Sequence, residues 1–235
     1  TLGQNQVSGQ TRLIVPRSRV TVHSTGDESL PGPGASITWP IHGGRDLSWY
    51  HTWRAHLGFF IPGPVDFTGL YDYEADQGIV RALPTPGWPA GSKFFGPAGL
   101  PPAIWTDDQS TYLELWSGAT GSFSSQATLD PGESVGWTEQ WYPVSGMQGY
   151  DYANPNAALR LTETASSVEV AVAVSAVTAG QVKLTANEQA IATWDVTLSP
   201  GQAFRTTKTR PKGDTGPLTL SLYNTAGALL AQTHQ

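Results

Sequence analysis

Residues 167–177 read SVEVAVAVSAV, and this stretch decides the class of fold. Valine recurs at every second position from Val168 to Val174, with small or acidic residues between. A period of two places alternate side chains on one face of an extended strand, whereas a helix would need a spacing of three or four. The pattern therefore predicts a β-strand with one buried face.

Short runs of β-branched and aromatic residues, bounded by Gly, Pro, Asp or Ser, predict further strands along the whole chain. They are expected over residues 13–15, 19–23, 37–39, 65–71, 78–83, 112–116, 126–129, 137–142, 181–185, 191–198, 204–208, 218–223 and 229–233. Expected helices are short, such as Asn156–Arg160. The chain is therefore expected to be all-β and to form sandwiches of antiparallel sheets.

The composition divides the chain into two parts. Eight of the nine tryptophans lie at or before Trp141. Residues 1–160 hold 14 acidic and 8 basic residues, whereas residues 161–235 hold five of each. We expect a larger β-sandwich domain over residues 1–162. A small immunoglobulin-like sandwich over residues 163–235 is expected to serve as a structural or docking module.

Charge and composition exclude several classes of partner. The 235 residues carry a net charge of −6, and the 13 Lys and Arg residues are scattered, so no nucleic-acid partner is expected. No apolar run approaches roughly 18 residues, so no membrane partner is expected either. The chain has no Cys, which excludes disulfides and thiolate metal sites. Asp72, Glu74 and Asp76 alternate as in a calcium loop but lack its final acid, so we expect a hairpin turn, no metal and no cofactor.

Aromatic rings and acids occur together in the first part of the chain, and this combination suits a saccharide. Rings stack on the apolar face of a pyranose, while carboxylates accept its hydroxyl protons. In DLSWYHTW, residues 46–53, a strand would place Trp49, His51 and Trp53 on one face. The alternative is an aromatic core strip that holds a hydrogen-bonded histidine.

A second such stretch is IWTDDQSTYLELW, residues 104–116. Trp105 and Asp107 precede a strand in which Glu114 and Trp116 share one face. Partial burial between rings would raise the pKa of Glu114 and suit it to proton transfer. If the leucines on the opposite face point to the core instead, Glu114 is an ordinary solvent-facing acid.

The third stretch is LDPGESVGWTEQWYPV, residues 129–144, in which a turn precedes a strand. Glu139 and Trp141 share one face of this strand with Trp137, either to line a ligand or to pack at an edge. The candidate ligand-binding residues are Trp49, Trp53, Trp105, Asp107, Trp116, Glu139 and Trp141.

The segments YLELWSG (residues 112–118) and LDPGESVGWTEQWYPV resemble the galactose mutarotase-like superfamily, which includes aldose 1-epimerases. More narrowly, GGRDLSWYHTW, GSKFFG, WTDDQSTYLELWSG and WTEQWYPVSGMQGYDYANPNAAL are similar to a bacterial domain-of-unknown-function family within it. The resemblance covers about residues 35–160. It implies a curved antiparallel supersandwich with a ligand groove on its concave face.

The resemblance also implies that Glu114 occupies the position of the mutarotase general base. His51 is the nearest match for the acid that protonates the ring oxygen, although Tyr50 departs from the family's Asn-His pair. Residues 1–162 are fewer than a complete supersandwich needs. We therefore expect an incomplete sandwich, or one completed by a second copy in a homodimer or by a partner chain.

Three functions remain open at this point. The favoured one is a carbohydrate-binding or carbohydrate-processing accessory protein, with a saccharide as partner. The second is an active sugar epimerase or hydrolase in which Glu114 acts as general base together with His51. The third is a structural or interaction domain of a larger assembly, in which the aromatic residues form the core.

Overall fold

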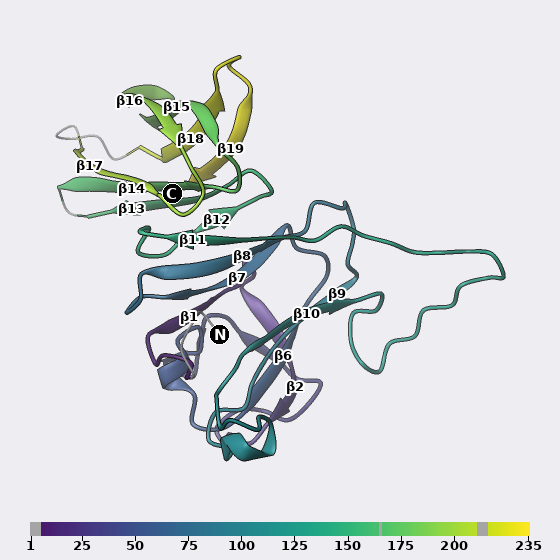
Figure 1. Cartoon of the computed structure of the whole chain (residues 1–235). Helices are drawn as coiled ribbons and strands as arrows, with labels where there is room; N and C mark the ends of the chain where they lie inside the picture. Colours follow the sequence, from purple (N-terminus) through teal and green to yellow (C-terminus); the bar gives the residue numbers. More distant parts are fainter. Residues whose placement is uncertain (1–5, 165, 211–215) are drawn as a thin grey trace. The chain divides into compact units, whose positions relative to one another are not determined.

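A computed structural model describes residues 6–164, 166–210 and 216–235, and in these residues the chain is built from β-strands (Figure 1). Helical structure there is limited to two three-residue 3-10 turns, η1 (Tyr50–Thr52) and η2 (Pro102–Ile104). The all-β class expected from the sequence is confirmed. Within the same residues, no helix has the length and apolar character needed to span a membrane.

The chain forms two compact units. Unit 1 comprises Thr1–Glu74 and Leu83–Glu139, and unit 2 comprises Ala75–Ala82 and Gln140–Gln235. This division differs from the expected boundary between residues 162 and 163. Strand β8 (Gln77–Ala82) belongs to unit 2 because it pairs along its length with β11 (Gln140–Ser145). Composition carries no signal for a pairing between segments so far apart in sequence.

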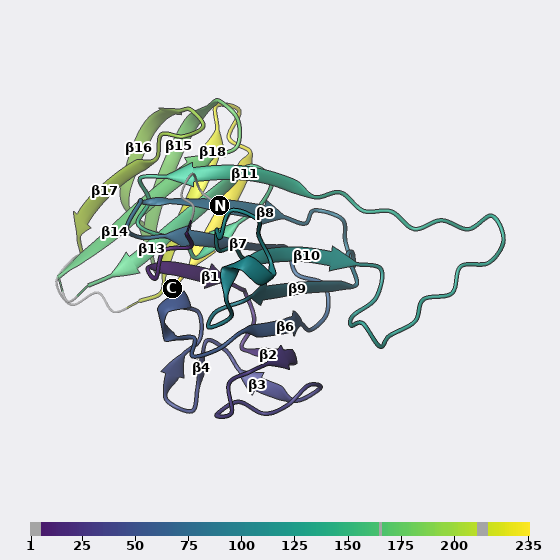
Figure 2. The ribbon, with the colours of Figure 1, turned by 60° about the horizontal axis from the view of Figure 1, so that its bottom comes forward.

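Unit 1 is organised around a five-stranded antiparallel sheet in the order β10-β9-β6-β2-β3 (Figure 2). Its strands are β2 (Arg19–Thr25), β3 (Ser36–Thr38), β6 (Leu57–Ile61), β9 (Gly91–Gly96) and β10 (Glu114–Gly118). Two smaller antiparallel pairs join β1 (Thr11–Ile14) to β7 (Phe67–Asp72) and β4 (Ile41–His42) to β5 (Arg45–Asp46).

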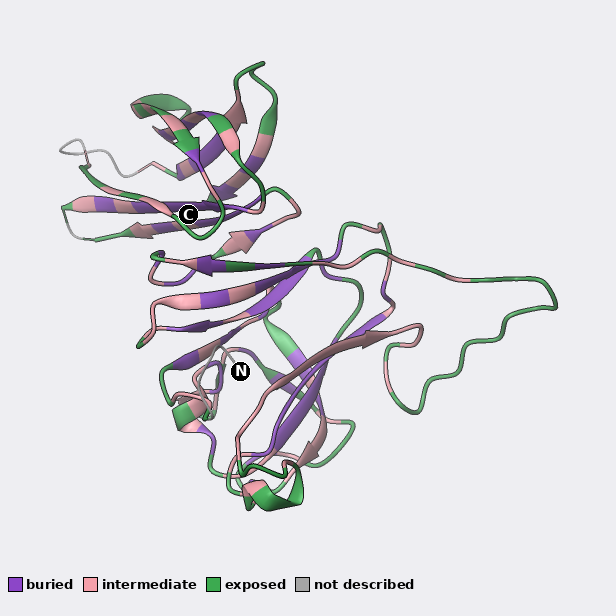
Figure 3. Ribbon diagram, viewed as in Figure 1, coloured by how far each residue is buried: buried purple, intermediate pink, exposed green. Residues whose placement is uncertain are grey.

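The two faces of this sheet have different roles. Phe59 of β6 lies opposite Phe94 of β9, and both point into the core, which also contains Leu13 of β1. The next pair, Phe60 and Lys93, points to the opposite face. Every residue of β6 and β9 is buried (Figure 3). Because both faces are covered, neither strand shows polar–apolar alternation, so the residue pattern alone predicted neither.

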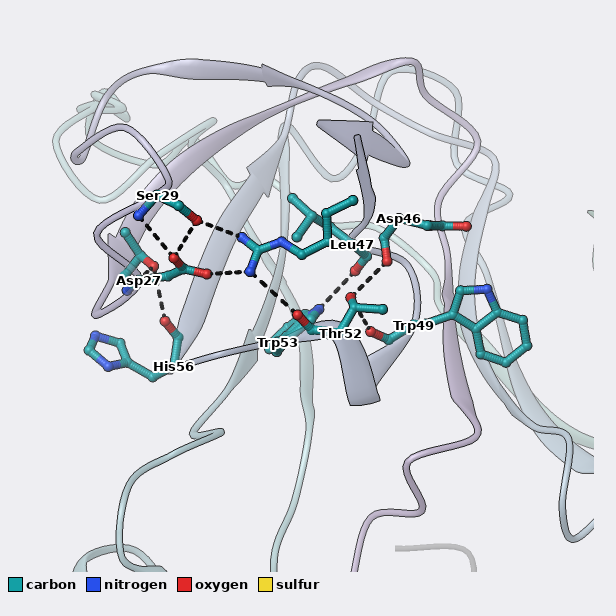
Figure 4. Close-up of polar contacts among 10 residues, drawn as sticks. Asp27, Ser29, Asp46, Leu47, Trp49, Thr52, Trp53 and His56 are labelled. Atoms are coloured by element: carbon teal, nitrogen blue, oxygen red, sulfur yellow. Dashed lines mark hydrogen bonds and ion pairs between the residues drawn. The ribbon is translucent and has the colours of Figure 1, made fainter. Parts of the chain in front are cut away.

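A buried ion pair fixes the loops at one end of unit 1 (Figure 4). Arg45 Nη1 lies 2.6 Å from Asp27 Oδ2, and Arg45 Nη2 donates to Ser29 Oγ at 3.2 Å. Ser29 also donates its backbone N–H and its hydroxyl to Asp27 Oδ1. Burial alone would raise the pKa of Asp27, but the hydrogen bonds from Ser29 and Arg45 outweigh it and lower that pKa.

Unit 2 contains two four-stranded antiparallel sheets around one core, which form a β-sandwich. One sheet holds β12 (Tyr152–Ala153), β13 (Ala157–Glu163), β14 (Ser167–Val174) and β17 (Phe204–Thr209). The other holds β15 (Thr178–Ala186), β16 (Gln189–Leu198), β18 (Leu218–Asn224) and β19 (Leu229–His234).

The valine alternation predicted the strand β14 correctly, because the side chains of Val168, Val170 and Val172 fill this core. The helix expected at Asn156–Arg160 was wrong. Residues Ala157–Glu163 form β13, in which Ala157 and Leu159 point into the same core. Here tertiary packing overrides the modest helix preference of the short segment.

The strands expected at residues 126–129 and 137–139 were also wrong. Residues 119–139 contain no strand, and β11 begins at Gln140. Figures 1 and 2 show this segment as two extended stretches that leave the end of β10, turn, and return toward β11.

Replacing Arg45 by methionine leaves the buried Asp27 carboxylate without its cation. We expect Arg45→Met to lower the free energy of unfolding by about 3 kcal/mol at pH 7. Because the folded-state pKa of Asp27 is lowered, the stability it contributes is present above its unfolded pKa of about 4 and is lost as the pH falls through the folded value. The cost of Arg45→Met should therefore shrink below about pH 4.

Urea unfolding followed by tryptophan fluorescence measures this cost, since seven of the nine tryptophans lie in unit 1. The matched control is Arg54→Met, because Arg54 is exposed; it should change the stability by less than about 0.5 kcal/mol. Equal effects of the two substitutions would contradict the structural role of the ion pair.

Candidate functional site

The face of the five-stranded sheet opposite the core carries an unusual set of side chains. One row across three strands holds Trp116, Lys93 and Phe60, and the next holds Glu114, Phe95 and Gly58. Side chains of such neighbouring rows project from the same face when they are two residues apart along each strand. We call this surface the outer face; it consists of His23, Phe60, Lys93, Phe95, Glu114 and Trp116.

A charged pair lies at the centre of the outer face. Lys93 Nζ lies 3.0 Å from Glu114 Oε2, and the side chain of Lys93 is only 7% exposed, compared with 35% for Glu114. The ammonium group also lies over the ring of Trp116 at 4.4 Å from its centroid, and over Phe123 at 5.2 Å. A buried ammonium group is costly without such partners, so the carboxylate and the rings together stabilise it.

A small pocket opens beside this pair. Phe123, which is 63% exposed, stacks on Trp116 with ring centroids 5.0 Å apart and forms one wall. The volume of the pocket is about 210 Å³, below the roughly 300–1,000 Å³ of typical drug-sized sites, so it suits a single small ring. It is lined by Phe60, Gly91, Ser92, Lys93, Trp116, Thr120, Ser122 and Phe123.

The histidine that faces this cluster is His23, which the sequence reasoning missed. It lies where the pairing of β2 with β6 is irregular, between Val22 and Ser24, and its ring fills the space above Gly58, where any side chain would collide with it. Burial, followed by the positive charge of Lys93, lowers the pKa of His23. The imidazole is therefore neutral at pH 7. Among the described residues, its buried Nε2 has no hydrogen-bond partner.

The expected strand at residues 19–23 contained a signal for His23. Val20 and Val22 alternate with polar residues, so His23 had to point away from the core. What the sequence did not show is which strands lie next to it.

Trp105 and Tyr112 border the outer face near Glu114. Trp105 follows η2, and its ring centroid lies 5.7 Å from that of Phe95. Burial, followed by the negative charge of Glu114 and a hydrogen bond to it, raises the pKa of Tyr112. Asp107 is exposed on the turn between these two residues. In the described parts of the chain, no group of three or more His, Asp or Glu side chains gathers as metal ligands would.

Glu139 connects the end of the 119–139 segment to β10. Ser117 donates its hydroxyl to Glu139 Oε1, and Trp137 Nε1 donates to the same oxygen at 2.9 Å. Ser117 follows Trp116 in β10 and so points to the other face of the strand. Glu139 is therefore engaged in holding this segment and is not part of the pocket.

The expectation that Trp49, His51 and Trp53 share one strand face was wrong, because η1 occupies this stretch. Trp53 is buried and donates its Nε1 to the carbonyl of Leu47 at 2.8 Å (Figure 4). Trp49 packs on Tyr73, at 4.9 Å between ring centroids. A 3-10 turn has three residues per turn, so it cannot keep every second side chain on one side.

The structure gives His51 and Trp141 other partners. His51 is exposed, and its Nδ1 lies 2.9 Å from the carbonyl oxygen of Gly9. Trp141 belongs to β11 of unit 2, where its ring covers the guanidinium of Arg81 at 5.3 Å. The structure therefore brings together Glu114, Trp116 and Trp105 from the expected set, and adds His23, Lys93 and Phe123.

In a comparison of this β-sandwich protein with known proteins, only part of the chain matches a described family. Residues 152–232, about a third of the chain, match the family model described as YphG-like protein, second domain. This stretch lies within unit 2 and contains most of its β-sandwich. No curated protein and no solved structure matches the chain.

The ion pair predicts an asymmetry between two substitutions. Glu114→Gln leaves the buried ammonium of Lys93 without its carboxylate, so we expect it to lower the free energy of unfolding by about 1–2 kcal/mol. This cost is smaller than that of breaking a fully buried ion pair, because Glu114 is a third exposed and solvent screens its charge. Lys93→Met keeps the aliphatic stem against the rings and leaves a solvent-accessible carboxylate, so it should cost less.

Urea unfolding of the two variants and of the double variant measures this asymmetry. The double variant should be more stable than Glu114→Gln alone. If Lys93→Met proves the more damaging of the two single substitutions, the ion pair is not what makes Lys93 tolerable in the sheet.

Proposed function

We propose that the outer face of unit 1 binds a saccharide and that the protein is a carbohydrate-binding accessory protein. The observation that carries the proposal is the Lys93–Glu114 pair set among aromatic rings beside a pocket of about 210 Å³. A pyranose ring presents an apolar face and a rim of hydroxyl groups. A ligand site for it needs rings and polar groups within one small space.

The chemistry of the lining fits these two needs. Trp116 and Phe123 offer ring surface, and Phe123 is largely exposed. Lys93 supplies N–H donors, and Ser122 supplies a hydroxyl group that both donates and accepts. Glu114 lies next to this lining and offers carboxylate oxygens to sugar hydroxyl groups.

The resemblance to the galactose mutarotase-like superfamily supports a sugar ligand, with Glu114 at the position of its general base. Binding without turnover is nevertheless the better-supported function. Lys93 and Tyr112 both engage the Glu114 carboxylate, and His51, the expected acid, makes its contact with Gly9 instead. These two proton donors point at the Glu114 carboxylate itself, an arrangement that favours holding a ligand over protonating a ring oxygen.

Substitution of the central ring tests the site. We expect Trp116→Ala to weaken binding of a glycan identified on a glycan array by about 1 kcal/mol or more, which is about a fivefold rise in Kd. The control is Trp141→Ala, which removes an exposed indole from unit 2 and should leave the Kd unchanged. Saturation-transfer NMR and calorimetry with the array hit give both values; equal Kd changes in the two variants would count against the site.

The enzymatic alternative has a separate readout. We expect the protein to leave the rate of interconversion between the anomers of the bound sugar unchanged, as measured by exchange NMR. A rate increase that Glu114→Gln abolishes would instead assign the epimerase function.

A further inference from the structure

The segment between β10 and β11 contains two extended stretches that we call the limbs, residues 126–129 and 134–137 (Figures 1 and 2). A defined turn joins them. The backbone N–H of Glu133 donates to the carbonyl of Asp130 at 2.8 Å, and Glu133 Oε2 accepts from the backbone N–H of Asp130 at 3.0 Å. The limbs are therefore joined by a built turn, and their base is tied to the sheet through Glu139.

The backbone of both limbs has no hydrogen-bond partner within the described residues. The positions that flank them do: the Ser125 N–H donates to Ser122 at 3.3 Å, and the Thr138 N–H donates to Thr85 Oγ1 at 2.8 Å. Backbone N–H and C=O groups are strong hydrogen-bonding groups, and an extended row of them is a template for another strand.

The side chains of the limbs alternate as in strands. Ala127 and Leu129 in the first limb, and Val135 and Trp137 in the second, are separated by polar residues or glycine. Leu129 is 52% exposed. The sequence pattern therefore specifies strands that lack a neighbour within the described chain.

A groove of about 660 Å³ lies between the limbs, within the usual range for a binding site. Residues of both limbs line it, so anything that enters it meets both unpaired backbones. Its lining consists of Trp88, Ala119, Ala127, Thr128, Leu129, Glu133, Ser134, Val135 and Gly136.

The charged residues of this segment are all acidic. Residues 119–139 contain Asp130, Glu133 and Glu139 and no Lys or Arg. Ser117 and Trp137 engage Glu139, which leaves the two acids of the turn as the charge that a partner meets. Two copies of the same acidic turn would repel each other, so charge favours a basic partner over a second copy of this chain.

We propose that the groove between the limbs takes up an extended strand of another polypeptide, with alternating apolar and basic side chains. The strand lies between the limbs and pairs with the backbone of both. Its apolar side chains cover Leu129 and Val135, and a basic side chain lies against Glu133. This is strand addition, in which main-chain hydrogen bonds supply affinity and alternate side chains supply specificity.

Hydrogen–deuterium exchange of the full chain tests the proposal, with a blocked peptide of alternating valine and lysine as the probe. We expect the peptide to slow exchange of the limb amides by about tenfold or more, because they gain hydrogen bonds. The same peptide with every backbone amide N-methylated should give no protection, since neither of its edges can then pair with a limb.

Variants of Val135 separate backbone pairing from side-chain contact. Val135→Pro removes an N–H from the second limb and should weaken peptide binding about tenfold, whereas Val135→Thr keeps the N–H and most of the shape and should weaken it less. Val135 lies outside the core of unit 1, so both variants should fold. Their tryptophan fluorescence and urea midpoints, compared with those of the unsubstituted chain, check this.

Four results would overturn the proposal. One is the absence of limb protection by the peptide at saturating concentration. Another is equal protection by the N-methylated peptide. The third is a dimer, detected by light scattering, whose formation protects the limbs without peptide and assigns the groove to a second copy. The last is protection by the array-selected glycan, which would assign the groove to sugar.

Discussion

A buried ammonium group is the constraint on which the outer face depends. Lys93 lies in a central strand with hardly any solvent exposure, and it is tolerable there because Glu114 and the ring of Trp116 come from the neighbouring strand. The antiparallel register of β9 and β10 delivers both partners at once. Any shift of one residue would turn Lys93 into the core and Phe94 onto the outer face.

The alternation of side chains along β6 and β9 gives the two faces of one sheet different functions. Phe59 and Phe94 secure the core of unit 1, while the residues beside them in sequence, Phe60 and Lys93, form the candidate binding surface. A substitution on the outer face therefore changes ligand contacts with little effect on core packing, unless it breaks the charge pair. This separation is what makes the proposed saccharide site testable by mutation.

The 119–139 segment differs from the outer face in how far its polar groups are paired. Lys93 is surrounded by partners, whereas the backbone of the limbs has no hydrogen-bond partner in the described chain, and Leu129 is largely exposed. Phe123 lies at the start of this segment and also walls the pocket beside Lys93. A strand bound between the limbs would thus order the segment from which one wall of the sugar pocket is built.

The sequence by itself determined the all-β class, the buried face of β14 and the shared face of Glu114 and Trp116, because a period of two is a local property of an extended chain. It failed at η1, where a tight turn leaves Trp49 and His51 in contact but places Trp53 in the core, and at β6 and β9, whose burial on both sides removes alternation. Only the tertiary structure decided that Lys93 and His23 join Glu114, since strand pairing between distant segments is set by the packing of the whole sheet.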